Sequence, residues 1–201
     1  MSNAIAKRIM IGKNAPLLGE APAIALVNPK FARNVGAVIR VAACFGLKQV
    51  WFSGDRMNID PTGKERIPRE ERMKGYANVQ LIQNDMFFNQ FSKDVVPVAI
   101  ELKDGAEQLH DFEHPEKALY VFGPEDGSLK RDELIRCHRR VVIPTRHCLN
   151  LATAVSIVMY DRLAKRHHNG QELIPDQNEI LKNDRACLRD LVDADDESII
   201  G

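Results

Sequence analysis

This sequence of 201 residues lacks the short motifs that mark several common enzyme classes. It contains no G-x-G-x-x-G after its first predicted strand, no G-x-x-x-x-G-K-[ST] loop and no G-x-S-x-G turn. These absences exclude the usual dinucleotide, nucleoside triphosphate and α/β-hydrolase motifs. The histidines show no HExxH or HxH spacing, so we expect no metal site.

Cysteine pairs and long apolar runs are also missing. The four cysteines, Cys44, Cys137, Cys148 and Cys187, show neither CxxC nor metal-ligand spacing, which is typical of reduced thiols in a cytosolic protein. There is no signal-peptide pattern, and the longest apolar run, residues 149–160, is too short to span a bilayer. We therefore expect a cytoplasmic location and no membrane partner.

Neither sign of charge is in excess, because 28 basic side chains balance 28 acidic ones. Locally, basic residues gather in residues 64–74, 136–140 and 162–168, whereas residues 190–197 are acidic. Binding to backbone phosphates requires such basic clusters, but solvated helix faces produce them too. Charge alone therefore leaves nucleic-acid binding open.

The sequence does contain a regular alternation of strand and helix patterns. Strand patterns occur at residues 23–27, 49–53, 79–82, 95–100, 118–122 and 140–143. Helix patterns occur at residues 35–45, 68–76, 84–92, 129–137 and 150–166, and a last helix is predicted to begin at Asp176, which has capping-box spacing to Glu179. This order predicts an α/β fold with a mostly parallel six-stranded sheet and helices on both faces. We predict one domain over residues 23–168, an N-terminal extension of residues 1–22, and a C-terminal extension of residues 169–201 with a helix.

One charge stands out in the first predicted helix. Residues 35–47, VGAVIRVAACFGL, contain a single charged side chain, Arg40, between Asn34, which can cap a helix, and Gly46, which can end one. A guanidinium on an otherwise apolar helix needs a partner, a phosphate or a task in an active site. A snorkelling or salt-bridged arginine is the alternative.

Polar loops follow three of the predicted strands, at residues 28–36, 123–128 and 144–150. Because ligands of parallel sheets bind at the carboxyl ends of the strands, these loops predict one site. In the second loop, Gly123 permits close approach of a ligand, Pro124 fixes the turn, and Glu125 can accept hydrogen bonds. The helix after the third loop is apolar on two faces. Either a second subunit covers one of them, or the helix lies centrally in the core.

These three segments resemble, in order and spacing, the motifs of the SpoU (TrmH-like) branch of the SPOUT RNA methyltransferases. The segments are NPKFARNVGAVIRVAACFGL (28–47), VFGPEDGSL (121–129) and IPTRHCLNLATAVSIVMY (143–160). The residues at motif positions are Asn34, Gly36, Arg40, Gly123, Glu125, Ile143, Pro144 and Asn150. The resemblance covers residues 23–166 and departs from the family pattern at Cys148, where a serine is typical.

The resemblance implies the SPOUT fold with a C-terminal trefoil knot, a homodimer, and S-adenosylmethionine as cofactor. The implied reaction is methyl transfer to a ribose 2′-hydroxyl of tRNA or rRNA. The residues implied in cofactor binding are Ile100, Gly123, Ile143, Cys148 and Leu149, and those implied in catalysis are Arg40, Asn34, Glu125 and Asn150. Because arginine has a pKa above about 12, it is a poor base, and anchoring the phosphate beside the target ribose is the physically easier role for Arg40.

Two other classes of function stay open at the level of the sequence. A non-catalytic RNA-binding protein could keep the same fold and basic clusters, although the motif residues Asn34, Arg40, Glu125 and Asn150 argue against it. A different α/β enzyme could bind a nucleotide-like small molecule. Titration with S-adenosylhomocysteine separates this last class, because such an enzyme should not bind that ligand.

Overall fold

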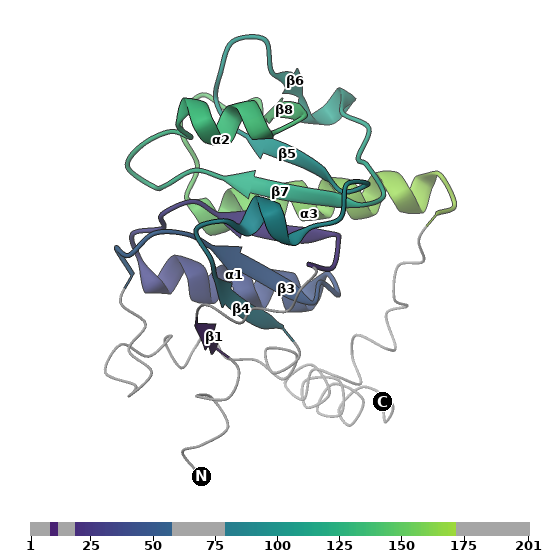
Figure 1. The fold of residues 1–201 in the computed structure, drawn as a ribbon. Coiled ribbons are helices and arrows are strands. Elements are labelled where there is room, and N and C mark those ends of the chain that lie inside the picture. The colour runs from purple at the N-terminus through teal and green to yellow at the C-terminus, as the bar shows by residue number, and fades with distance from the viewer. Residues whose placement is uncertain (1–8, 12–18, 58–78, 172–201) are drawn as a thin grey trace, which may run out of the picture. The chain divides into compact units, whose positions relative to one another are not determined.

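The computed structural model describes residues 9–11, 19–57 and 79–171. In these residues eight strands form one sheet in the order β1-β4-β3-β2-β7-β5-β8-β6, and every pairing is parallel (Figure 1). The strands are β1 (Ile9–Ile11), β2 (Ala23–Leu26), β3 (Gln49–Phe52), β4 (Gln80–Gln83), β5 (Val96–Ile100), β6 (Glu107–Gln108), β7 (Ala118–Phe122) and β8 (Arg139–Val142). The prediction of a mostly parallel α/β sheet is confirmed.

Helices cover both faces of this sheet, as predicted. On one face lie α1 (Ala32–Cys44) and the part of α3 (Leu151–His168) up to Arg162 (Figure 1). On the other face lie α2 (Arg131–Arg136) and the 3₁₀ helix Phe87–Gln90. Two layers of hydrophobic core, one on each side of the sheet, result from this arrangement.

The central strand β2 shows why the sheet needs both layers. Ile24 and Leu26 join the core beneath α1, whereas Ala23 and Ala25 join the core beneath α2. Successive side chains of a strand point to opposite faces, so a strand covered on both faces must be apolar at every position. The continuous apolar runs of β2 and β7, buried along their whole length, meet this requirement.

The sheet has eight strands, not the six predicted. The two additional strands, β1 and β6, lie at opposite edges of the sheet and comprise three and two residues. Runs this short show no alternating pattern that could reveal them in a sequence. Short strands are common at sheet edges, where they limit pairing with other chains.

The helix predicted at residues 84–92 is also shorter than expected. Only the 3₁₀ helix Phe87–Gln90 forms, and the Asn84 Oδ1 accepts the Met86 N–H at 2.7 Å. Such a local side-chain bond offers the backbone an alternative to helix formation. The predicted helices at residues 68–76 and from Asp176 onward lie outside the described residues, as does the basic cluster at residues 64–74.

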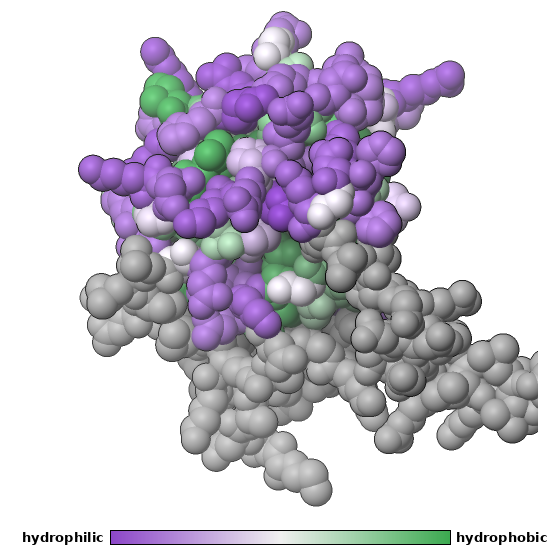
Figure 2. Space-filling view, turned by 90° about the vertical axis from the view of Figure 1, so that its right-hand side faces the viewer, coloured by the Kyte–Doolittle hydropathy of each residue, from purple (hydrophilic) through white to green (hydrophobic). Residues whose placement is uncertain are grey.

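The chain divides into two compact units, residues 1–162 and residues 163–201. The domain limits predicted from the sequence stay predictions. Viewed from the right-hand side of Figure 1, the described surface is mostly hydrophilic, and hydrophobic side chains form only small areas on it (Figure 2). Among the described helices, none is long and apolar enough to cross a bilayer.

Candidate functional site

The first motif includes the start of α1. The N-terminus of this helix is held by a carboxylate that is distant in the sequence. The helix starts at Ala32, and Phe31 is an N-cap residue without a side-chain hydrogen bond. The Glu125 Oε2 accepts the Lys30 N–H at 2.7 Å, and the Oε1 accepts the Phe31 N–H at 3.3 Å. A carboxylate is favourable at a helix N-terminus, where backbone N–H groups lack partners. The prediction that Asn34 caps this helix is therefore wrong.

The other end of α1 is formed as predicted. Gly46 has a φ of 71°, a left-handed conformation that favours glycine. Its N–H donates to the Ala43 carbonyl at 3.3 Å, and the Leu47 N–H donates to the Ala42 carbonyl at 2.9 Å. These two bonds make a Schellman motif, in which glycine ends the helix.

Three of the four predicted catalytic residues are joined by hydrogen bonds. Asn34, which is 7% exposed, donates from Nδ2 to the Glu125 Oε1 at 2.8 Å, and its Oδ1 accepts the Asn150 Nδ2–H at 3.1 Å. The Asn150 Oδ1 accepts the Ala152 N–H at 3.0 Å, which caps α3. This Glu125–Asn34–Asn150 bridge ties together the loops after β2, β7 and β8.

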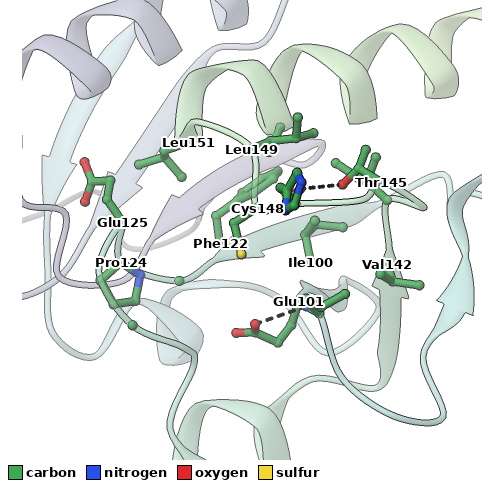
Figure 3. A pocket seen from close by; sticks show the side chains of 16 residues that line it. Ile100, Glu101, Phe122, Pro124, Glu125, Val142, Thr145, Cys148, Leu149 and Leu151 are labelled. Carbon is green, nitrogen blue, oxygen red and sulfur yellow. Dashed lines mark hydrogen bonds between the residues drawn. The ribbon is translucent and has the colours of Figure 1, made fainter.

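A pocket lies at the carboxyl ends of β5, β7 and β8 (Figure 3). Its lining includes all five residues expected to bind the cofactor: Ile100, Gly123, Ile143, Cys148 and Leu149. Glu125 also lines it, so the bridge reaches the pocket wall. The other lining residues are Glu101, Leu102, Phe122, Pro124, Gly127, Val142, Thr145, His147, Leu151 and Ala154. The structure thus gathers the predicted loops at one edge of the sheet.

The pocket wall is tightly packed at Gly123. A Cβ placed there would lie 3.2 Å from the Leu129 backbone nitrogen and 3.5 Å from the Glu101 Oε2. These two atoms are themselves hydrogen bonded at 2.7 Å. A side chain at this motif position would therefore require the Leu129 backbone to shift by a few tenths of an ångström.

A cluster of charges lies next to Glu125. Arg56, in the loop after β3, donates two hydrogen bonds of 2.8 Å to the Asp126 carboxylate, and the Lys30 ammonium donates a third at 3.1 Å. Hydrogen bonds from Arg56 and then Lys30 hold the pKa of the Asp126 carboxyl well below its usual range. Asp126 is therefore ionised at neutral pH, and its hydrogen bonds link the loops after β2 and β3 to the loop after β7.

The order and content of these loops match a known family. The match extends over residues 21–160 and is to the SpoU rRNA Methylase family. The chain belongs to the SpoU rRNA methylase family. The second and third motif segments line the pocket, and Asn34 of the first segment is hydrogen bonded to both of them.

Individual SpoU relatives resemble the chain over most of its length. A tRNA (cytidine-2′-O-)-methyltransferase TrmJ from Methanocaldococcus jannaschii is 28% identical over 185 residues, which are 82% of this chain and 76% of that protein. The crystal structure of the TrmH/SpoU tRNA modifying enzyme from A. aeolicus has a TM-score of 0.63 at 17% identity and covers 92% of each chain. An AdoMet-bound rRNA methyltransferase from Sinorhizobium meliloti has a TM-score of 0.62 at 22% identity, covering 78% of this chain and 61% of that one.

Arg40 lies apart from the other predicted residues of the SpoU motifs. It is an exposed residue in the middle of α1 and is not among the residues that line the pocket. It follows Asn34 by six residues, which places the two side chains on different sides of the helix. Because Arg40 is exposed, its charge does not carry the cost of burial that an apolar helix suggested in the sequence. An exposed position is compatible with the alternative of a snorkelling or salt-bridged arginine, and the catalytic role of Arg40 stays a prediction.

Sequence reasoning missed two charged residues of this region, Glu101 and Arg56. Each follows a strand, Glu101 directly after β5 and Arg56 shortly after β3. The same rule that selected the other loops, polar side chains at the carboxyl ends of parallel strands, would have found both. In the part of the chain that the structure describes, no group of His, Cys, Asp or Glu side chains could hold a metal ion.

Proposed function

We propose that this chain transfers the methyl group of S-adenosylmethionine to a ribose 2′-hydroxyl of tRNA or rRNA. The observation that carries the proposal is the Glu125–Asn34–Asn150 bridge, which joins the three family motifs beside one pocket. The proposal is supported by the name of the M. jannaschii relative, a tRNA 2′-O-methyltransferase, and by the AdoMet bound to the S. meliloti structure.

The chemistry of the pocket fits this cofactor. Ile100, Phe122 and Leu149 supply apolar surface for a purine ring, and Glu101 supplies a hydrogen-bond acceptor. When bound, the cofactor supplies a methyl group on a sulfonium, which is already activated for transfer. The protein then has to align the ribose oxygen with that methyl group and let the hydroxyl proton leave.

The bridge residues suit positioning better than proton transfer. The Glu125 carboxylate accepts bonds from Lys30, Phe31 and Asn34, so its oxygens are already engaged. Asn34 and Asn150 carry amides, which do not titrate. We infer that these residues hold the pocket loops and the start of α1 in one arrangement. The target ribose would be bound next to them.

The RNA would approach along the start of α1. Arg33 and Arg40 are both exposed and seven residues apart, so they share one face of the helix. Phe31 is 46% exposed, and the Lys30 ammonium lies 5.3 Å from the centre of its ring. Cations beside an exposed aromatic ring suit the phosphates and bases of an unpaired RNA segment.

Methyl transfer can be tested directly on bulk RNA. The protein is incubated with labelled S-adenosylmethionine and either tRNA or rRNA, and the methylated nucleosides are identified by mass spectrometry. We expect label in 2′-O-methylated nucleosides of one of the two RNA classes. Binding of RNA and of S-adenosylhomocysteine without any transfer would favour the non-catalytic RNA-binding alternative. The proposal implies that the substrate is an RNA of the cytoplasm.

Cys148 provides a test of cofactor placement that needs no RNA. Saturating S-adenosylhomocysteine, at about 100 times its Kd, is expected to slow alkylation of Cys148 by iodoacetamide about 100-fold, because about 1% of the pockets remain empty. Cys148 is exposed and lines the pocket, whereas Cys44 is exposed on α1 outside it. Peptide mass spectrometry reports both rates.

Cys44 is the matched control in this alkylation experiment, and its rate should not change. Burial raises the pKa of the Cys137 thiol to about 12, so that residue should stay unmodified with or without ligand. Equal rates at Cys148 with and without S-adenosylhomocysteine would show that the ligand binds elsewhere.

A homodimer is the second part of the proposal, and the outer face of α3 supports it. Leu151, Val155 and Met159 of this helix are buried in the core, but Tyr160 is 65% exposed and Ile157 is only partly buried. Ile157 packs against the same core, so the apolar surface that a second copy of the chain would cover is centred on Tyr160. The trefoil knot implied by the family resemblance likewise stays a prediction.

Light scattering is expected to give a mass of about twice 22.7 kDa at micromolar concentration. Tyr160→Glu should weaken the dimer at least about tenfold, because a charge would lose water at the interface. Ile135→Glu on α2, where the native side chain is 64% exposed, is the matched control and should stay dimeric. A parent protein of 22.7 kDa in solution would contradict the prediction.

A further inference from the structure

Glu101 is a second carboxylate at the pocket, and none of the three motifs includes it. It lines the pocket directly after the last residue of β5. Its Oε2 accepts the Leu129 N–H at 2.7 Å, and its Oε1 accepts the Leu102 N–H at 3.0 Å. Figure 3 shows it on the opposite side of the pocket from Leu149. Two backbone donors, one for each oxygen, thus hold the carboxylate in place at the pocket wall.

Glu101 has more acceptor capacity left than Glu125. A carboxylate offers about four lone-pair positions. Glu125 accepts three hydrogen bonds from protein groups, whereas Glu101 accepts two, one on each oxygen. A Cβ at position 123 would lie 3.5 Å from the Glu101 Oε2, so the glycine places no side chain next to this oxygen. By this count, each oxygen of Glu101 keeps one lone-pair position that no described protein group occupies.

The surroundings of Glu101 favour a ligand that carries hydrogen-bond donors. Ile100, Phe122 and Val142 line the pocket with it and offer no hydrogen bonds from their side chains. A ligand that fills the pocket displaces the water next to the carboxylate, and an ionised group that loses water without a new partner is costly. A neutral acceptor would serve the two backbone N–H groups as well. The charged group is therefore explained by a ligand that donates to it.

We propose that Glu101 binds the two hydroxyls of the cofactor ribose, an inference that rests on the proposed function. Two adjacent hydroxyls present two donors side by side, which match the two oxygens of one carboxylate. The adenine amino group and the methionine ammonium each offer their donors from a single nitrogen. Glu101 thus selects an adenosyl ligand that has an intact ribose.

The test measures binding by calorimetry with two ligands, S-adenosylhomocysteine and its 2′,3′-dideoxy analogue. The parent protein should bind the analogue roughly 10- to 100-fold more weakly, as expected for hydrogen bonds to a charged group. Glu101→Gln should lose a similar factor for S-adenosylhomocysteine and should lose little more for the analogue. Asp104→Asn is the matched control, because Asp104 is exposed in the same loop and does not line the pocket.

Each other result overturns the ribose assignment in a distinct way. A parent that binds both ligands equally overturns it without reference to any variant, so the test does not depend on the folding of Glu101→Gln. If Glu101→Gln weakens both ligands by the same factor, Glu101 only supports the Leu129 loop. If the variant binds 5′-methylthioadenosine as tightly as the parent does, the partner is the ammonium, which that ligand lacks. If the parent fails to bind S-adenosylhomocysteine at all, the proposed function itself is wrong.

Discussion

Arg40→Ala is expected to lower methyl transfer about 30- to 1000-fold while leaving the affinity for S-adenosylhomocysteine unchanged. Losing a charge-assisted contact to the phosphate next to the target ribose should cost about 2–4 kcal/mol in the transition state. Binding of the cofactor should not change, because Arg40 does not line the pocket. Single-turnover transfer of labelled methyl to bulk RNA, together with a calorimetric titration, measures both quantities.

Two controls separate this role from a structural one. Arg40→Lys should recover little activity, since lysine lacks the planar fork that grips two phosphate oxygens. Arg40→Ala should keep the melting temperature of the parent to within a few degrees, because surface substitutions change stability by about 0.5 kcal/mol or less. An alanine variant that methylates RNA at the parental rate would remove Arg40 from the mechanism.

Gly123→Val is expected to weaken S-adenosylhomocysteine binding about 100-fold, the largest effect that we expect on the cofactor. Its Cβ would lie 3.2 Å from the Leu129 backbone nitrogen, and its two methyl groups would enter the pocket or push the Leu129 turn aside. Overpacking of this kind costs about 1–3 kcal/mol, and each 1.4 kcal/mol is about tenfold in affinity. Isothermal titration of the variant measures the loss.

Gly123→Ala provides a graded comparison. It adds the Cβ alone, which requires a shift of the neighbouring backbone by a few tenths of an ångström. We expect a smaller loss of affinity than for valine, and a melting curve shows whether either variant loses stability as well. Parental affinity in Gly123→Val would mean that the ligand does not lie against Gly123.

The sequence predicted which loops meet, because that result depends on local patterns alone. Apolar runs separated by helix patterns specify parallel strands, and parallel strands bring their carboxyl ends to one edge. Pairs of residues distant in the chain were harder to predict. Asn34 has the right residue type for a helix cap, but the N–H groups at the start of α1 bond instead to Glu125. Gly46 needs only its own backbone conformation, and its role was predicted correctly.

Glu101 and Arg56 illustrate what residue type alone does not disclose. A glutamate or arginine in a loop is most often solvated, and nothing in the sequence marks Leu129 as a donor to Glu101 or Asp126 as a partner of Arg56. The exposed position of Arg40 was not predicted for a similar reason. A helix rich in apolar residues still has a face toward solvent, and the sequence did not specify which face Arg40 occupies.

The Glu125–Asn34–Asn150 bridge also bears on when the protein can become active. Its two hydrogen bonds join residues that are 91 and 116 positions apart in the chain. Contacts between such distant residues form late in folding, because closing a long loop costs conformational entropy before the contact exists. A growing chain on the ribosome would contain the α1 segment well before Asn150 is synthesised. During synthesis, the nascent polypeptide would therefore lack a finished site until the segment that contains Asn150 has been made.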